Sequence, residues 1–314
     1  MLKRLLILTP LILGAPSLLA QSSDRQPLFP SNPAITRIGE LTYLGGVVLS
    51  HPDGRFGGMS GLFRNGDGFV AVSDQGNWIT FDTSETESGQ LMAIDQVTIT
   101  AIKDAAGFRL DGGDVDAEAV ARGPGGGLLV AFERNHRILE FAGVGANGFN
   151  YLRPPAGGIG SNGGYEAMTT LTGGRLIAIA ESNRVDENRF RGFITDQNRK
   201  IATRFELVRR DGFRPTDMVQ MPDGDILLLE RYFRAPSTVA ARVSRIAVTD
   251  LKQGAEITPA TLATIRQPAL VDNMEGIAIR PAPDNGVWIY LVSDDNFNIA
   301  QRTILMKFSY YPTR

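Results

Sequence analysis

Cysteine is absent from the 314-residue chain, and histidine occurs only at positions 51 and 136. The first absence excludes disulfide bonds, thiolate metal sites and a cysteine nucleophile. The second excludes a metal centre built from several histidines. The formal net charge is only -2, so the chain also lacks the strong positive charge of many nucleic-acid-binding proteins. We therefore expect no nucleic-acid partner.

Long apolar runs are missing as well. The run at residues 5–14 holds about ten residues, whereas a membrane-spanning helix needs roughly 20. Lys3 and Arg4 precede this run and Ala20 follows it, which is the pattern of a secretory signal peptide; the alternative is a retained membrane anchor. We expect a bacterial protein exported to the periplasm or the medium, a monomer with no integral membrane segment after signal removal. The expected plan is a signal peptide at 1–20, an N-terminal extension at 21–40 and one folded domain at 41–314.

Glycine and proline, by contrast, are frequent, at 35 and 17 residues, which favours many turns and short strands. Five segments share one plan: a polar residue, a small residue, an apolar strand, a turn, a second apolar strand and an acid. They begin at positions 60, 118, 166, 217 and 275, so successive starts lie 48 to 58 residues apart. Hairpins that recur at this period are typical of propeller blades.

We therefore predict an all-β fold, a single β-propeller with four-stranded antiparallel blades. Removing residues 1–20 leaves 294 residues, or 49 for each of six blades. Five blades are visible as repeats, and we expect strands at 41–50 and 303–310 to share a sixth blade that closes the ring. Five or seven blades are the alternatives. Long segments of helical period are absent, which disfavours an α/β sheet.

The polar residues of the repeats point to a metal site. Each hairpin carries one before its first strand and one after its second, so both lie at the same open end, on one rim of the central channel. Carboxylates crowded in this way repel one another unless a cation offsets their charge, and calcium accepts about 6–8 oxygen ligands. The alternative is that each acid caps its own blade. We predict calcium as the cofactor, with the metal ligands Asp74, Glu118, Glu133, Glu166, Glu181, Asp217, Glu230, Glu275 and Asp294.

Arginine far exceeds lysine, with 27 of the 32 basic residues. Guanidinium groups bind phosphate and carboxylate bidentately, so arginines beside the acidic rim favour a small anionic substrate such as a phosphoester. The alternative is that these arginines pair with the acids. Ser60 lacks the Gly-x-Ser-x-Gly spacing of a nucleophile elbow, and the catalytic residues stay unassigned. The candidate substrate-binding residues are Arg55, Arg134, Arg184, Arg231 and Arg302.

Several short motifs together resemble one known family. They are Phe56 to Leu62, Val72 to Gly76, Asp116 to Val120, Phe132 to Arg134, Asn162 to Ala167, Leu229 to Phe233, Asn273 to Gly276 and Ser293 to Phe297. In this order the chain resembles the phytase-like family, described as having the esterase-like activity of phytase, over about residues 55–310. The resemblance implies an exported bacterial β-propeller and suggests hydrolysis of phosphoesters of the phytate type.

Three functions fit these observations. The leading hypothesis is an exported, calcium-dependent phosphoric-ester hydrolase, in which the acidic rim holds the metal and arginines hold the substrate. The second is a non-enzymatic propeller that binds a ligand or partner at the rim and uses calcium structurally. The third is a lactonase-type esterase, because calcium at a propeller axis can also polarise a carbonyl group.

Overall fold

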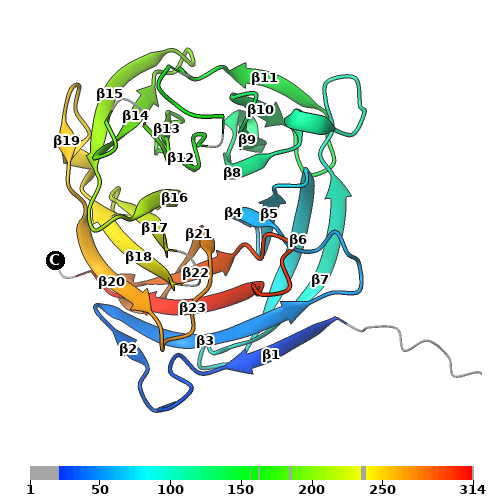
Figure 1. The fold of residues 1–314 in the computed structure, drawn as a ribbon, viewed down its shortest axis with the longest axis vertical. Helices are drawn as coiled ribbons and strands as arrows, with labels where there is room; N and C mark the ends of the chain where they lie inside the picture. Colours follow the sequence, from blue (N-terminus) through cyan, green and yellow to red (C-terminus); the bar gives the residue numbers. More distant parts are fainter. Residues whose placement is uncertain (1–20, 156, 162, 184–185, 235–237, 313–314) are drawn as a thin grey trace, which may run out of the picture.

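The computed structural model describes residues 21–155, 157–161, 163–183, 186–234 and 238–312. The first twenty residues, where we predicted a signal peptide, lie outside these ranges. Figure 1 shows a single ring of β-sheets around a central axis. Within the described ranges, no helix has both the length and the apolar character needed to cross a membrane.

The ring has five blades, and the prediction of six was wrong. The segments at 41–50 and 303–310 form strands β3 (Leu41–Ser50) and β23 (Ile304–Tyr310), but they do not make a blade of their own. They pair with each other and complete the sheet begun by the last repeat. The hairpin of the last repeat leaves one strand edge unpaired. β23 pairs with this edge, and β3 then pairs with β23. The five repeats are therefore the five blades.

Three of the five sheets have the predicted four antiparallel strands. The first blade contains β4 (Met59–Asn65), β5 (Gly68–Ser73), β6 (Asn77–Glu85) and β7 (Leu91–Ala101). The second contains β8 (Ala117–Arg122), β9 (Leu128–Phe132), β10 (Arg137–Phe141) and β11 (Gly148–Leu152). The fourth contains β16 (Arg214–Gln220), β17 (Ile226–Arg234), β18 (Thr238–Ile246) and β20 (Ala260–Arg266).

The other two sheets carry additional strands. The third blade contains β12 (Ala167–Thr170), β13 (Leu176–Ile179), β14 (Arg189–Thr195) and β15 (Ile201–Val208), with β19 (Glu256–Ile257) added in parallel. The fifth contains β21 (Met274–Pro281), β22 (Val287–Ser293), β23 and β3, and the segment at 21–40 adds β1 (Ser22–Gln26) and β2 (Arg37–Ile38). Short 3-10 helices lie in the connections, at Gly112–Asp114, Pro124–Gly126, Val248–Asp250 and Pro283–Asn285.

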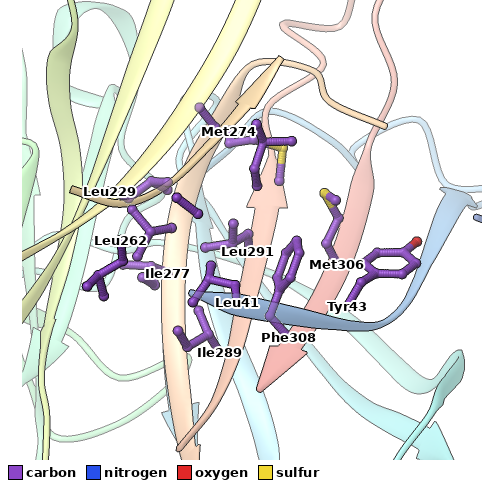
Figure 2. Close-up of a cluster of buried hydrophobic side chains, with 14 of the residues drawn as sticks. Leu41, Tyr43, Leu229, Leu262, Met274, Ile277, Ile289, Leu291, Met306 and Phe308 are labelled. Atoms are coloured by element: carbon purple, nitrogen blue, oxygen red, sulfur yellow. The ribbon is translucent and has the colours of Figure 1, made fainter. Parts of the chain in front are cut away.

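Apolar side chains fill the space between neighbouring blades. Figure 2 shows the cluster between the fourth and fifth blades. Its labelled members are Leu229 and Leu262 from the fourth blade and Leu41, Tyr43, Met274, Ile277, Ile289, Leu291, Met306 and Phe308 from the fifth. Each fully buried aliphatic or aromatic side chain contributes about 1.5–3 kcal/mol to stability. The closing strands β3 and β23 therefore hold the ring together by packing as well as by hydrogen bonds.

The innermost strands β4, β8, β12, β16 and β21 surround the axis (Figure 1). In four of these strands the pairing register shifts at one residue near the start, a β-bulge that redirects one side chain. The bulged residues are Ser60, Glu118, Thr216 and Glu275. Three of these four residues, Ser60, Glu118 and Glu275, line the cavity at the open end of the channel.

Candidate functional site

An acidic cavity of about 540 Å³ opens at the end of the channel where the innermost strands begin. Seven of the nine predicted metal ligands line it, together with one acid that we did not predict, Asp116. The eight carboxylates are Asp74, Asp116, Glu118, Glu133, Glu166, Glu181, Glu275 and Asp294. Ser60, Asn273 and Asn296 add neutral oxygens. The predicted acidic rim is thus one continuous lining, contributed by four of the five blades.

One backbone hydrogen bond recurs beneath these acids. The acid after the second strand donates its N–H to a carbonyl just before the first strand of the same blade. The four bonds are Asp74 to Gly58 (3.1 Å), Glu133 to Asp116 (2.9 Å), Glu181 to Gly164 (3.0 Å) and Asp294 to Asn273 (2.9 Å). This bond holds the two ends of each hairpin together, which is why two separate sequence positions per repeat meet in one cavity.

Glycine is required where the loops approach the acids most closely. Gly58 has a φ of +60°, and a Cβ there would lie 2.3 Å from Asp74 Oδ1. Gly164 donates its N–H to Glu133 Oε1 at 3.0 Å, and a Cβ there would lie 3.0 Å from the Glu133 side chain. The backbone can therefore contact these carboxylates directly only because no side chain intervenes.

Asp217 is buried deeper in the channel, outside the lining of the acidic cavity. Its Oδ2 accepts the N–H groups of Ile277 at 2.8 Å and Leu62 at 3.3 Å, and its Oδ1 accepts that of Met218 at 2.8 Å. The bulged residue of this blade is Thr216, so Asp217 stands where the other blades have glycine or alanine. The carboxylate thus joins the innermost strands of three blades.

Glu230 is also held away from the acidic cavity. It lies within β17, which continues to Arg234, whereas the corresponding acids of the other blades follow the end of their strands. Arg242 donates to Glu230 Oε1 at 2.6 Å and Oε2 at 2.8 Å, and Ser244 donates to Oε2 at 2.7 Å. Glu230 and Arg242 are both 2% exposed. This acid is a partner in a buried ion pair.

Asp116 is the site residue that our sequence reasoning missed. It precedes the bulged Glu118 by two residues, and it lies beside Arg134, whose Nε is 2.7 Å from Asp116 Oδ2. The spacing of Asp116 and Glu118 is the available signal, because residues two apart on an extended segment share a face. The repeat plan takes only one acid at each strand end and so leaves Asp116 out.

Burial and mutual repulsion raise the pKa values of these acids. The pKa of Asp74 is raised to about 7, that of Glu133 to about 7 and that of Glu275 to about 8. The pKa values of Glu118 and Glu166 are raised well above the ordinary value. Burial is the largest cause in each case, and the charges of neighbouring carboxylates add to it. The cavity therefore favours any positive charge, whether a proton or a metal ion.

The spacing of the acids fits a cation. Carboxylate oxygens of Asp116, Glu118 and Glu133 lie within 4.8 Å of one another, and so do those of Glu133, Glu166 and Glu181. Oxygens bound to one calcium ion at about 2.3–2.6 Å can be at most about 5 Å apart. Each trio could therefore share one ion, and Glu133 belongs to both.

Two of the five predicted arginines line the acidic cavity. Arg231 lies between Glu181, at 3.2 Å from its Nη2, and Glu275, at 2.9 Å from its Nε. Arg134 reaches the mouth, where its side chain is 56% exposed. Arg55 pairs instead with Asp53 and Arg302 lies beside Asp272, and Arg184 is outside the described residues.

Fold and site together define the class: a five-bladed β-propeller with an acid-lined cavity at one end of its channel. A profile of the phytase-like family, described as esterase-like activity of phytase, matches residues 54–297. The chain belongs to this family, and the resemblance seen in its sequence motifs is confirmed.

Solved structures share the fold at low sequence identity. An endo-arabinase from Bacteroides thetaiotaomicron is 9% identical with a TM-score of 0.51, over 83% of this chain and 96% of the other. An α-L-arabinofuranosidase from Podospora anserina is 13% identical with a TM-score of 0.50, over 86% and 97%. No curated protein matches the sequence. These similarities show the propeller fold alone.

Proposed function

We propose that this protein is an exported, monomeric, calcium-dependent hydrolase of phosphoric esters, with its site in the acidic cavity. The observation that carries the proposal is the pair of carboxylate trios that share Glu133, each with its oxygens within 4.8 Å. Asp116, Glu118, Glu133, Glu166 and Glu181 would hold the cation. Their raised pKa values support this role, because a bound cation relieves the repulsion that otherwise keeps protons on them.

The cation, when bound, supplies positive charge that polarises the phosphoryl group. Arg231 and Arg134 bind the remaining phosphoryl oxygens, since guanidinium groups match the geometry of phosphate. Glu181 and Glu275 hold Arg231 from two sides, so its position is fixed before substrate arrives. Positioned charge of this kind is the main contribution a protein makes to phosphoryl transfer.

Asp74 is the group that accepts a proton from the attacking water. Its Oδ1 is buried and has no hydrogen-bond partner among the described residues, while the carboxylate lines the acidic cavity. Water adds its oxygen to phosphorus, the ester P–O bond breaks, and the proton taken by Asp74 is returned through solvent to the leaving alcohol. The products are inorganic phosphate and the free alcohol.

Calcium binding and turnover test this proposal together. We expect the purified protein to bind calcium in calorimetry and to release phosphate from an aryl phosphate and from a polyol phosphate. Phosphate release should cease on chelation and return with added calcium. Glu166→Gln should weaken both properties, whereas Glu87→Gln, an exposed carboxylate in the turn between β6 and β7, is the matched control.

Other outcomes identify the alternative functions. Calcium binding with turnover of aryl carboxylic esters or lactones, but not of phosphates, would replace the proposal with a lactonase-type esterase. Calcium binding without any turnover would indicate a propeller that binds a ligand or partner. Absence of calcium binding would refute the role given to the carboxylate trios.

A further inference from the structure

A second polar pocket lies beside the acidic cavity, on the same end of the propeller. It has a volume of about 370 Å³, and its lining includes Ser161, Ser182, Glu187, Phe190, Arg209 and Arg214. Ser182 directly follows Glu181, which lines the acidic cavity. Arg214 Nη1 lies 4.0 Å from Glu181 Oε1 and donates to the Glu181 carbonyl at 3.3 Å. Glu181 therefore forms part of the wall between the two cavities.

The charges of Glu187, in the lining, and of Glu181 act on Arg209, but no carboxylate forms a close ion pair with either arginine of this pocket among the described residues. Arg209 forms no ion pair within 4.0 Å among the described residues, and Arg214 has only the long contact with Glu181. Arg242, in the neighbouring blade, shows the contrast, because it contacts Glu230 at 2.6 Å and Asp211 at 3.1 Å. With two arginines and one carboxylate, Glu187, the lining carries one net positive charge beside a strongly acidic cavity.

Most of the hydrogen-bond donors of these arginines are unused. A guanidinium group has five N–H donors. Arg209 uses Nη1 on the Glu187 carbonyl at 3.3 Å and Nη2 on the Gly212 carbonyl at 3.1 Å, and its Nε is buried without a described partner. Arg214 has the single described bond to the Glu181 carbonyl. The hydrogen bonds to backbone carbonyls therefore use only a minority of the N–H donors of Arg209 and Arg214.

We propose that the pocket lined by Arg209 and Arg214 binds an oxyanion, a phosphate or carboxylate group of the same substrate whose ester reacts in the acidic cavity. Ser161 lines the same space and its hydroxyl can donate to such a group, whereas the Ser182 hydroxyl donates to the Gly163 carbonyl at 3.2 Å. The substrate class is then an ester with at least two anionic groups. This inference rests on the proposed function for the identity of the substrate, but not for the binding of the anion.

Anion binding can be measured without turnover. The probe is inorganic phosphate, titrated into calcium-free protein at low ionic strength with a chelator present, and followed by calorimetry or phosphorus NMR. Acetate replaces phosphate in a second titration, which distinguishes a phosphate site from a carboxylate site. We expect Arg214→Gln and Arg209→Gln each to weaken binding of the preferred anion about tenfold or more, because each removes charged hydrogen bonds.

Two further variants make the result specific. Arg175→Gln, an exposed arginine at the β12–β13 turn on the opposite face, removes the same charge and should leave anion binding unchanged. Arg231→Gln tests whether the anion sits in the acidic cavity instead. Loss of binding in Arg231→Gln but not in Arg214→Gln would overturn the inference, as would the absence of arginine-dependent binding of both anions. Arg214 is 40% exposed in its side chain, so that variant should fold even if the Arg209 variant does not.

Kinetics then separate this inference from the proposed function. If the protein hydrolyses esters, Arg214→Gln should raise the KM of a doubly anionic substrate and leave kcat and the KM of a singly anionic one unchanged. If hydrolysis is absent but phosphate binding depends on Arg214, the anion pocket stands and the hydrolase proposal fails. If hydrolysis occurs and phosphate binding ignores Arg214, the anion pocket fails alone.

Discussion

Glu230 and Glu166 occupy related places in the sequence repeat, but the structure gives them opposite surroundings. Glu230 is 2% exposed and accepts hydrogen bonds from Arg242 and Ser244. Glu230→Gln would leave the buried Arg242 with Asp211 as its remaining carboxylate partner, and the Asp211 side chain is 74% exposed. Breaking a buried ion pair from one side costs about 3–5 kcal/mol. We therefore expect the free energy of unfolding to fall by about 3 kcal/mol, with Tm lower by about 5 °C.

The same substitution at Glu166 should weaken calcium binding without lowering the stability of the calcium-free protein. Burial is the largest cause of the raised pKa of Glu166. The charges of the neighbouring Glu181, Glu118 and Glu275 raise it further. In the calcium-free protein the raised pKa keeps this carboxyl group protonated, so a neutral amide of similar size changes the charge of the cavity little. The calcium-free protein should keep its stability, while calcium affinity falls about tenfold or more because one carboxylate ligand is lost.

Denaturant unfolding with and without calcium, together with calcium calorimetry, separates the two effects. Glu230→Gln should change stability and keep calcium affinity. Glu166→Gln should keep stability in chelator and lose calcium affinity. If Glu166→Gln were destabilised by several kcal/mol in chelator, its carboxylate would be a structural partner. If Glu230→Gln lost calcium affinity without loss of stability, the assignment of Glu230 to an ion pair would be refuted.

Three further changes have defined outcomes. Folding raises the pKa values of Glu133 and Glu275 from 4.5 to about 7 and about 8, so the stability gained from their protonation is complete below pH 4.5 and is lost as the pH rises through 7 and 8. Chelated protein should therefore unfold at a lower urea concentration at pH 8 than at pH 5. Added calcium should remove this difference. Asp217→Ala leaves three buried backbone N–H groups without their acceptor and should cost about 3 kcal/mol or more, measured by denaturant unfolding, while calorimetry shows unchanged calcium affinity. Asp74→Asn should lower kcat for phosphate release and leave KM and calcium affinity near their original values, and equal losses in all three would contradict its role as proton acceptor.

The repeat pattern was sufficient to predict a propeller because each blade is built from the same local sequence pattern. Apolar strands joined by glycine turns form hairpins, and hairpins at a regular period can bury their faces only against one another. The polar residues at both strand ends identified one acidic end of the channel for the same reason. Seven of the nine acids chosen in this way line one cavity.

Two of the misassignments arose because a local pattern does not determine register. The sequence plan starts the fourth repeat at Asp217, although the residue after it, Met218, is not small. Only the pairing of β16 with β17 shows that Thr216 is bulged and that Asp217 turns toward the channel interior. The extension of β17 to Arg234 likewise places Glu230 opposite Arg242, which no short-range signal indicated.

By itself, the sequence determined the strand content, the five repeated hairpins and the crowding of acids at one end, because these depend on residues close together along the chain. Tertiary structure alone decided the blade count, through the pairing of β3 with β23, since ring closure joins residues from opposite ends of the chain. It also decided which acids face the cavity and which are neutralised. It placed Arg209 and Arg214 beside Glu181, because the environment of a charge depends on neighbours brought together from several blades.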